Sequence, residues 1–193
     1  MQSLVFITGA SSGIGQALAL RYYQAGWRLA LVARRVSDMQ AWCHQQGMPP
    51  DTVKCYQADV SQTNSILGAA HACMAEMGVP DVVIANAGIS IGMDTSVRED
   101  LEVLSQVLAT NVVGMAATFH PFIEAMKRRA QTHPTSRAGT LVGIASVAGI
   151  RGLPGHGAYC ASKSSVIAKA CAVSSSLRAL KLSPLPRAIS RRL

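Results

Sequence analysis

Short apolar segments alternate along this chain with segments in which apolar residues recur at helical spacing. The apolar segments cover residues 3–7, 29–33, 53–60, 82–85 and 140–145. They are apolar almost throughout, which is typical of parallel strands that are buried on both faces. Parallel neighbours need a crossover connection, and a helix usually supplies it. The pattern therefore predicts an α/β fold, a Rossmann-type doubly wound parallel sheet with helices on both faces.

Helices are predicted between these strands. They cover residues 14–25, 64–77 and about 99–129, and a further helix carries Tyr159 and Lys163. Ligands of doubly wound sheets bind at the carboxyl ends of the strands, near the point where the strand order reverses. We therefore expect the functional residues in the turns that follow the strands.

A glycine-rich turn, TGASSGIG at residues 8–15, connects the first strand to the first helix. Glycines in such a turn let the backbone approach a pyrophosphate, whose charge is stabilised by the free N–H groups of the helix N-terminus. A glycine-rich turn can arise by chance, but the strand before it and the helix after it are the context that this motif requires. We assign to the predicted dinucleotide site Gly9, Ser11, Ser12, Gly13, Ile14 and Gly15.

The end of the second strand indicates which dinucleotide binds. A site for NAD usually has an acidic residue here, about 20 residues past the glycines, which binds the ribose 2′-hydroxyl. This chain has Ala33, Arg34 and Arg35 instead. A guanidinium fits a 2′-phosphate, and no acid repels it. NADP is therefore the predicted cofactor, with Arg34 as its ligand, and NAD is the alternative if both arginines are only surface charge.

Ser146, Tyr159 and Lys163 form a set of residues that can move a proton at a carbonyl group. A free tyrosine ionises near pH ~10, but an ammonium one helical turn away stabilises the phenolate. A serine hydroxyl can hold the carbonyl oxygen while the tyrosine donates or accepts the proton. A Tyr–Lys pair at this spacing also fits a solvated helix face. The glycine-rich turn earlier in the chain favours the catalytic interpretation.

Over residues 3–170 these motifs, in this order, resemble the short-chain dehydrogenase/reductase family in its common single-domain form. The resemblance implies an NAD(P)-dependent oxidoreductase that interconverts a secondary alcohol and a ketone by hydride transfer. It also implies roles for residues after the third and fourth strands. Asp59 and Val60 would contact the adenine, and Asn86, Ala87 and Gly88 would support the sheet and the cofactor.

The resemblance further implies a catalytic tetrad. Tyr159 would be the general acid/base, Lys163 would bind the nicotinamide ribose, and Ser146 would orient the carbonyl. Asn111 would hold a water molecule that relays protons through the lysine. Asparagine is unfavourable in the middle of a helix, so we expect a local distortion at Asn111 that frees a backbone carbonyl for that water. The alternative is an asparagine that faces solvent.

Composition narrows the class of protein. The chain has 193 residues, of which 49% are hydrophobic and 15% charged, as expected for one domain with a buried core. The five cysteines have no metal-ligand spacing, so we predict no metal and reduced thiols in the cytoplasm. Neither a signal peptide nor a transmembrane helix is expected, so no membrane is a predicted partner. The expected partner is a small carbonyl or alcohol substrate, and for an intact chain the family resemblance implies a homodimer or homotetramer.

The C-terminal part departs from the family pattern. All ten acidic residues lie at or before Glu124, and twelve lysines and arginines follow it. From about residue 173 the sequence is rich in Ser and then in Arg and Pro, without a strand pattern. We predict an incomplete NADP-binding domain over residues 1–173 and an irregular basic tail over residues 174–193. The last two strands and the substrate lid of the family would then be missing, which leaves the strand at residues 140–145 at a sheet edge.

A reading-frame shift is our interpretation of this tail. One consistent choice of codons for residues 173–193, read two bases along, encodes a helix end, a segment rich in β-branched residues and a Pro-Gly turn. The shift also explains the basic charge, so nucleic-acid binding is not predicted. Besides the oxidoreductase, one alternative stays open, a catalytically inactive remnant or a nucleotide-binding protein without turnover.

Overall fold

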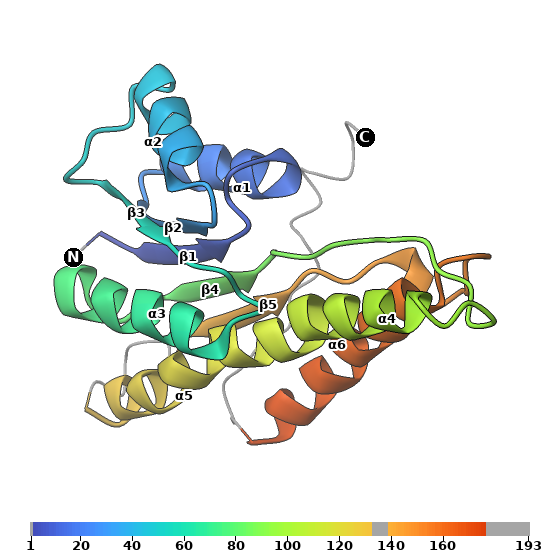
Figure 1. The fold of residues 1–193 in the computed structure, drawn as a ribbon. Helices are drawn as coiled ribbons and strands as arrows, with labels where there is room; N and C mark the ends of the chain where they lie inside the picture. The colour runs from blue at the N-terminus through green and yellow to red at the C-terminus, as the bar shows by residue number, and fades with distance from the viewer. Residues whose placement is uncertain (1, 133–138, 177–193) are drawn as a thin grey trace.

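The structure of the protein is a computed structural model that describes residues 2–132 and 139–176 (Figure 1). Five parallel strands form one sheet in the order β3-β2-β1-β4-β5. The strands are β1 (Leu4–Thr8), β2 (Arg28–Ala33), β3 (Val53–Gln57), β4 (Val82–Ala85) and β5 (Thr140–Gly143). The chain builds outward from β1 to β3 and then returns to the other side of β1. This reversal between β1 and β4 is the point at which doubly wound sheets bind their ligands.

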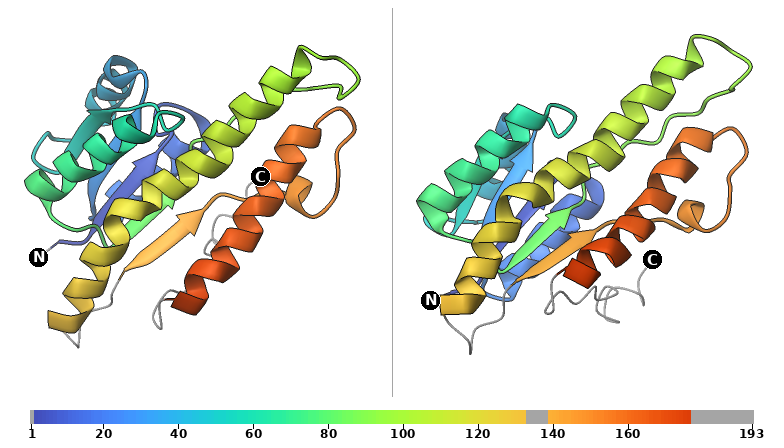
Figure 2. Two further views of the ribbon diagram at one scale, coloured as in Figure 1. Left: turned by 60° about the horizontal axis from the view of Figure 1, so that its bottom comes forward. Right: turned by 90° about the horizontal axis from the view of Figure 1, so that it is seen from below.

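Helices cover both faces of this sheet (Figure 1). One face is covered by α1 (Gly13–Gln24) and α2 (Val36–Gln45). The other face is covered by α3 (Thr63–Met77), α5 (Gly114–Thr132) and α6 (Gly157–Ser176), with α4 (Asp100–Leu108) leading into α5. Seen from two further sides, the long helical rod of α4 and α5 lies beside α6 (Figure 2). The predicted doubly wound fold is confirmed.

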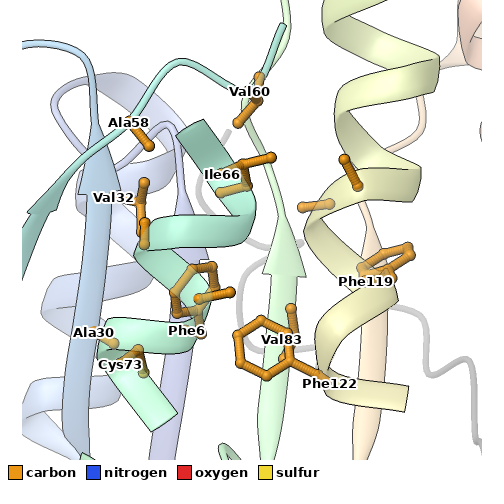
Figure 3. Packing of buried hydrophobic residues seen from close by; sticks show 14 of the residues in the cluster. Phe6, Ala30, Val32, Ala58, Val60, Ile66, Cys73, Val83, Phe119 and Phe122 are labelled. Carbon is orange, nitrogen blue, oxygen red and sulfur yellow. The ribbon is translucent and has the colours of Figure 1, made fainter. Parts of the chain in front are cut away.

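The near-continuous apolar strands arise because alternate side chains enter two different cores. Phe6 belongs to the cluster under α3 and α5, where its ring lies 4.9 Å from that of Phe122 (Figure 3). Ile7, its neighbour, belongs to the cluster under α1 and α2, together with Leu18 and Met39. Both residues of the strand are fully buried. Each face of β1 is therefore anchored independently, which holds the turn after this strand in place.

Two elements differ from the prediction. The third strand ends at Gln57 rather than at Val60. Asp59 accepts hydrogen bonds from the N–H and the hydroxyl of Ser61 at 2.9 and 2.8 Å, and this turn takes the chain out of the sheet. Helix α2 was not predicted. Only Met39 and Cys43 of its residues are buried, so its apolar periodicity is weak.

The helix predicted over residues 99–129 is continuous but distorted where Asn111 lies. A π-helical turn, Ala109–Val113, separates α4 from α5, and the Gly114 N–H donates to the carbonyl of Ala109, five residues earlier. The expected distortion is therefore confirmed. Asn111 is only 3% exposed, so the alternative of a solvent-facing asparagine is wrong. A Cβ at Gly114 would lie 2.7 Å from the Val60 carbonyl oxygen, so only glycine allows this approach.

The helical segment Asp100–Thr132 reaches a mean hydropathy of 1.2 and is long and apolar enough, by length and composition only, to cross a membrane. The sequence prediction had no such segment. In the structure Phe119, Phe122 and Met126 of this segment are core residues against the sheet, which accounts for its apolar composition.

Two predictions concern the C-terminal part of the chain, the edge position of the last strand and the irregular tail over residues 174–193. Within the described residues β5 pairs with β4 alone and is an edge strand, as expected. Helix α6 continues to Ser176, so residues 174–176 of the predicted irregular tail are helical. The rest of the predicted tail, residues 177–193, lies outside the described part of the chain.

Candidate active site

A cleft of about 660 Å³ opens at the carboxyl ends of β1, β2 and β4, where the strand order reverses. It is the place that the fold predicts for a ligand. Three of the predicted cofactor residues do not line the cleft, namely Gly15, Tyr159 and Lys163. The predicted residues that do line it are Gly9, Ser11, Ser12, Gly13, Ile14, Arg34, Asp59, Val60, Asn86, Ala87 and Gly88.

The glycine-rich turn is shaped by close backbone contacts. Gly9 has a φ of +66°, and a Cβ there would lie 2.8 Å from the Cα of Ala87. A Cβ at Gly15 would collide with the Gly9 carbonyl oxygen, so this glycine lets α1 pack against the turn. Gly13 has a φ of +53° with nothing within 4 Å of its Cβ position, so it faces open space at the start of α1. An exposed helix N-terminus of this kind can bind an anion.

Asn86 ties the glycine-rich turn to the neighbouring strand. Its Nδ2 donates to the carbonyls of Thr8 and Gly9 at 3.0 and 3.2 Å. In return the Thr8 hydroxyl accepts from the backbone N–H groups of Asn86 and Ala87, both at 3.2 Å. Thr8 begins the predicted glycine-rich motif, but it was not assigned individually to the dinucleotide site. A polar residue at the end of an otherwise apolar strand is the signal that identifies it.

Two arginines lie where the second strand ends. The Arg34 Nη1 is 3.9 Å from Asp59 Oδ2, and its side chain is 65% exposed. Arg35 also lines the cleft, and its Nε donates to Asp38 Oδ2 at 2.9 Å. Exposed ion pairs of this kind contribute little, so both guanidinium groups can exchange their partners for an anion. The sequence prediction missed Asp38 because it missed α2.

Asn111 holds the segment after β4 with its side-chain amide. Its Oδ1 accepts from the Ile89 N–H at 2.8 Å, and its Nδ2 donates to the Ile89 carbonyl at 2.8 Å. The same Nδ2 donates to the Ser162 hydroxyl at 2.9 Å. Both Ile89 and Ser162 are absent from the predicted site. Nothing in the local sequence of either residue marks this contact.

Lys163 is the most unusual charged group of the site. Its side chain is only 6% exposed, and its Nζ donates to the Ile144 carbonyl at 2.7 Å. Burial lowers the pKa of the Lys163 ammonium, because desolvation disfavours the charged form. The Nζ lies 5.5 Å from the ring centre of Tyr159, one helical turn earlier. A Cβ at Gly88 would lie 3.1 Å from Asn111 Oδ1 and 3.7 Å from this Nζ, so all three residues meet at one point.

Ser146 begins a short 3₁₀ turn, Val147–Gly149, and its hydroxyl accepts from the Ala148 N–H at 3.2 Å. This turn packs directly on α6. A Cβ at Gly149 would lie 2.7 Å from the Lys163 backbone, and the Ser164 hydroxyl donates to the Gly149 carbonyl at 2.8 Å. The turn therefore holds Ser146 close to α6, the helix that carries Tyr159 and Lys163. Among the described residues Ser146 and Tyr159 are not hydrogen-bonded to each other.

The fold and the site together are those of a nucleotide-binding oxidoreductase of the short-chain type. The sequence model of a family described as short chain dehydrogenase matches residues 3–180. The chain belongs to the short-chain dehydrogenase/reductase family.

The relatives share most of this chain but are longer. An uncharacterized oxidoreductase of Myxococcus xanthus is 38% identical over 157 residues, which are 81% of this chain and 59% of that protein. 17-beta-hydroxysteroid dehydrogenase type 1 of Mus musculus is 35% identical, over 83% of this chain and 46% of that protein. The chain thus spans about half of these curated relatives.

Solved structures agree on the fold. An alcohol dehydrogenase from the archaeon Thermococcus sibiricus, complexed with 5-hydroxy-NADP, is 26% identical with a TM-score of 0.83, over 94% of this chain and 74% of that one. A 3-ketoacyl-(acyl-carrier-protein) reductase from Brucella melitensis, complexed with NADH, has the same TM-score of 0.83 at 23% identity, over 93% of this chain and 73% of that one.

Proposed function

We propose that this chain binds NADP and interconverts a secondary alcohol and a ketone. The observation that carries the proposal is the buried Lys163 ammonium, which lies one helical turn from Tyr159 and beside Gly88 at the wall of the cleft. Burying an ammonium costs free energy, and no carboxylate pairs with Lys163 among the described residues, which makes it a candidate for a functional group. The proposal extends what the relatives' names say, an oxidoreductase and a hydroxysteroid dehydrogenase, to this chain.

The cleft fits a dinucleotide. The open space beside Gly13 at the start of α1 suits a pyrophosphate, and the tight contacts at Gly9 and Gly15 bring the backbone to that point. Asp59 and Val60 would contact the adenine, and the segment from Asn86 to Gly88 would support the cofactor along its length. Tyr159 and Lys163 would bind the nicotinamide ribose. When bound, the nicotinamide supplies or accepts the hydride.

NADP is proposed rather than NAD because of the charge at the end of β2. Arg34 is largely exposed and its separation of 3.9 Å from Asp59 is long for an ion pair, so a 2′-phosphate can replace this partner. Arg35 provides a second guanidinium at the same rim. Solved structures with this fold contain both kinds of cofactor, since the Thermococcus sibiricus enzyme is complexed with 5-hydroxy-NADP and the Brucella melitensis reductase with NADH.

The protein's own residues would move the proton. Tyr159 donates a proton to the carbonyl oxygen in reduction and accepts it in oxidation. The Lys163 ammonium, 5.5 Å from the ring centre, stabilises the negative charge that the phenol acquires when it loses this proton. Ser146 holds the carbonyl oxygen. Asn111, in the π-helical turn, holds the water that restores the proton through Lys163.

Two measurements on the same sample test the proposal. NADPH binding is followed by titration, and NADPH consumption is followed at 340 nm against a broad panel of ketones. We expect binding with consumption. Tyr159→Phe should lose consumption but still bind NADPH, because the proposed contacts of the pyrophosphate, the adenine and Lys163 remain. Binding without consumption by the parent protein would favour the alternative of a nucleotide-binding protein without turnover. Absence of NADPH binding would refute the proposal.

A further inference from the structure

Ser162 links the two halves of the site, although it is not one of the residues expected to touch substrate or cofactor. It lies in α6, three residues after Tyr159, and its side chain is fully buried. Its hydroxyl donates to the Tyr159 carbonyl at 2.7 Å and accepts from Asn111 Nδ2 at 2.9 Å. Lys163, its neighbour in sequence, is the buried ammonium of the site.

The direction of these two hydrogen bonds follows from which of the groups can donate a hydrogen and which can only accept one. A carbonyl oxygen only accepts, so the single hydroxyl hydrogen of Ser162 is committed to Tyr159. The hydroxyl then offers only lone pairs to Asn111, and only the Nδ2 end of the amide can donate to them. A flipped amide would place its oxygen against the Ser162 oxygen. The serine therefore requires the same orientation of the Asn111 amide as the Ile89 N–H and carbonyl do.

This orientation determines the position of the chain segment that lines the cleft. With Nδ2 toward α6, the amide oxygen of Asn111 faces the Ile89 N–H and its Nδ2 also reaches the Ile89 carbonyl. Ile89 and the adjacent Gly88 line the cleft. A hydroxyl on α6 is thus linked, through Asn111, to the segment after β4.

We propose that Ser162 is a positioning residue, which couples the helix that carries Tyr159 and Lys163 to the cofactor-facing segment at Gly88 and Ile89. The role in binding rests on the proposed function, because that function makes this cleft the cofactor site. The hydrogen-bonded link itself does not depend on it. Removal of the hydroxyl should release the Asn111 amide, and with it the Ile89 backbone.

The experiment compares Ser162→Ala with Ser165→Ala. Ser165 lies in the same helix, and its hydroxyl donates to the Ala161 carbonyl at 3.0 Å, four residues earlier. Among the described residues the Asn111 side chain is hydrogen-bonded to Ile89 and Ser162 and not to Ser165. Amide hydrogen exchange of Ile89 is measured by NMR, with the Phe6 amide of β1 as the internal reference. We expect Ile89 to exchange about fivefold to tenfold faster in Ser162→Ala, as the loss of one hydrogen bond predicts. It should be unchanged in Ser165→Ala, and Ser162→Thr, which restores a hydroxyl, should return it toward the parent value.

The amide exchange of Ile89 tests the positioning role of Ser162 without any measurement of enzyme activity. Equal Ile89 exchange in Ser162→Ala and Ser165→Ala would overturn it, as would a change that appears equally at Phe6, because that would be general destabilisation. NADPH titration of the same variants separates the two proposals. If the parent protein binds no NADPH but Ile89 still responds to Ser162→Ala, the proposed function fails while the positioning link stands. If the parent binds, Ser162→Ala should weaken binding by about fivefold and Ser165→Ala should not.

Discussion

Replacing Asn111 by alanine should destabilise the protein far more than a typical asparagine substitution. The change removes three hydrogen bonds, two with the Ile89 backbone and one with Ser162. At about 1 kcal/mol each, and with some recovery by water at the half-buried Ile89, the free energy of unfolding should fall by about 2–3 kcal/mol. For a chain of this size the corresponding fall in Tm is roughly 5–10 °C.

The assay is urea unfolding followed by circular dichroism, with Tm measured in parallel. Asn64→Ala is the matched control, because Asn64 is an exposed asparagine in the first turn of α3. Its effect should stay within about 0.5 kcal/mol. A loss below 1 kcal/mol in Asn111→Ala, with an unchanged urea dependence, would refute the reasoning that this amide holds the π-helical turn to the segment after β4.

Three further outcomes are expected. Burial lowers the pKa of Lys163 below its ordinary value of 10.5, so between the lowered pKa and 10.5 the unfolded chain binds more protons than the folded chain, and stability rises with pH. The free energy of unfolding in urea is therefore measured from pH 8 upward for the parent protein and for Lys163→Met. The value for the parent should rise with pH relative to that for Lys163→Met, and a difference that stays constant with pH would contradict this. Gly15→Ala should abolish NADPH binding in titration, since its Cβ would collide with the Gly9 carbonyl. Gly15→Ala should also lower the free energy of unfolding by more than Gly13→Ala, whose Cβ meets no atom and which should cost only about 1–2 kcal/mol from its positive φ; equal losses of stability would count against the packing argument. Arg34→Ala should weaken NADPH binding by about tenfold or more and leave NADH binding unchanged, whereas an equal loss for both cofactors would rule out a 2′-phosphate contact.

Local chemistry made much of the fold predictable. The strands could be recognised because β1, β2 and β4 are buried on both faces and are therefore apolar without alternation. Helix α2 escaped because it presents only Met39 and Cys43 to the core. The end of β3 escaped for a different reason, since the Asp59 turn that terminates it is a side-chain contact rather than a change in hydrophobicity.

The candidate site likewise has features that could be predicted from the sequence and features that could not. Asn111 was expected to mark a distorted helix because asparagine is unfavourable there, and the π-helical turn is at that position. What the amide contacts was not predictable, because Ile89 lies 22 residues before it and Ser162 lies 51 residues after it. The roles assigned to the tetrad and to the cofactor residues stay predictions that the proposed binding and turnover measurements test.

By itself, the sequence determined the parallel sheet, the glycine-rich turn at its switch point and the one-turn spacing of Tyr159 and Lys163, because each depends on neighbours within a few residues. Only the tertiary structure decided that Lys163 is buried against the Ile144 carbonyl and that Asn111 joins Ile89 to Ser162. Burial and directional hydrogen bonds depend on which distant segments the packed sheet brings together. No local pattern records that arrangement, so these contacts appear only once the chain is folded.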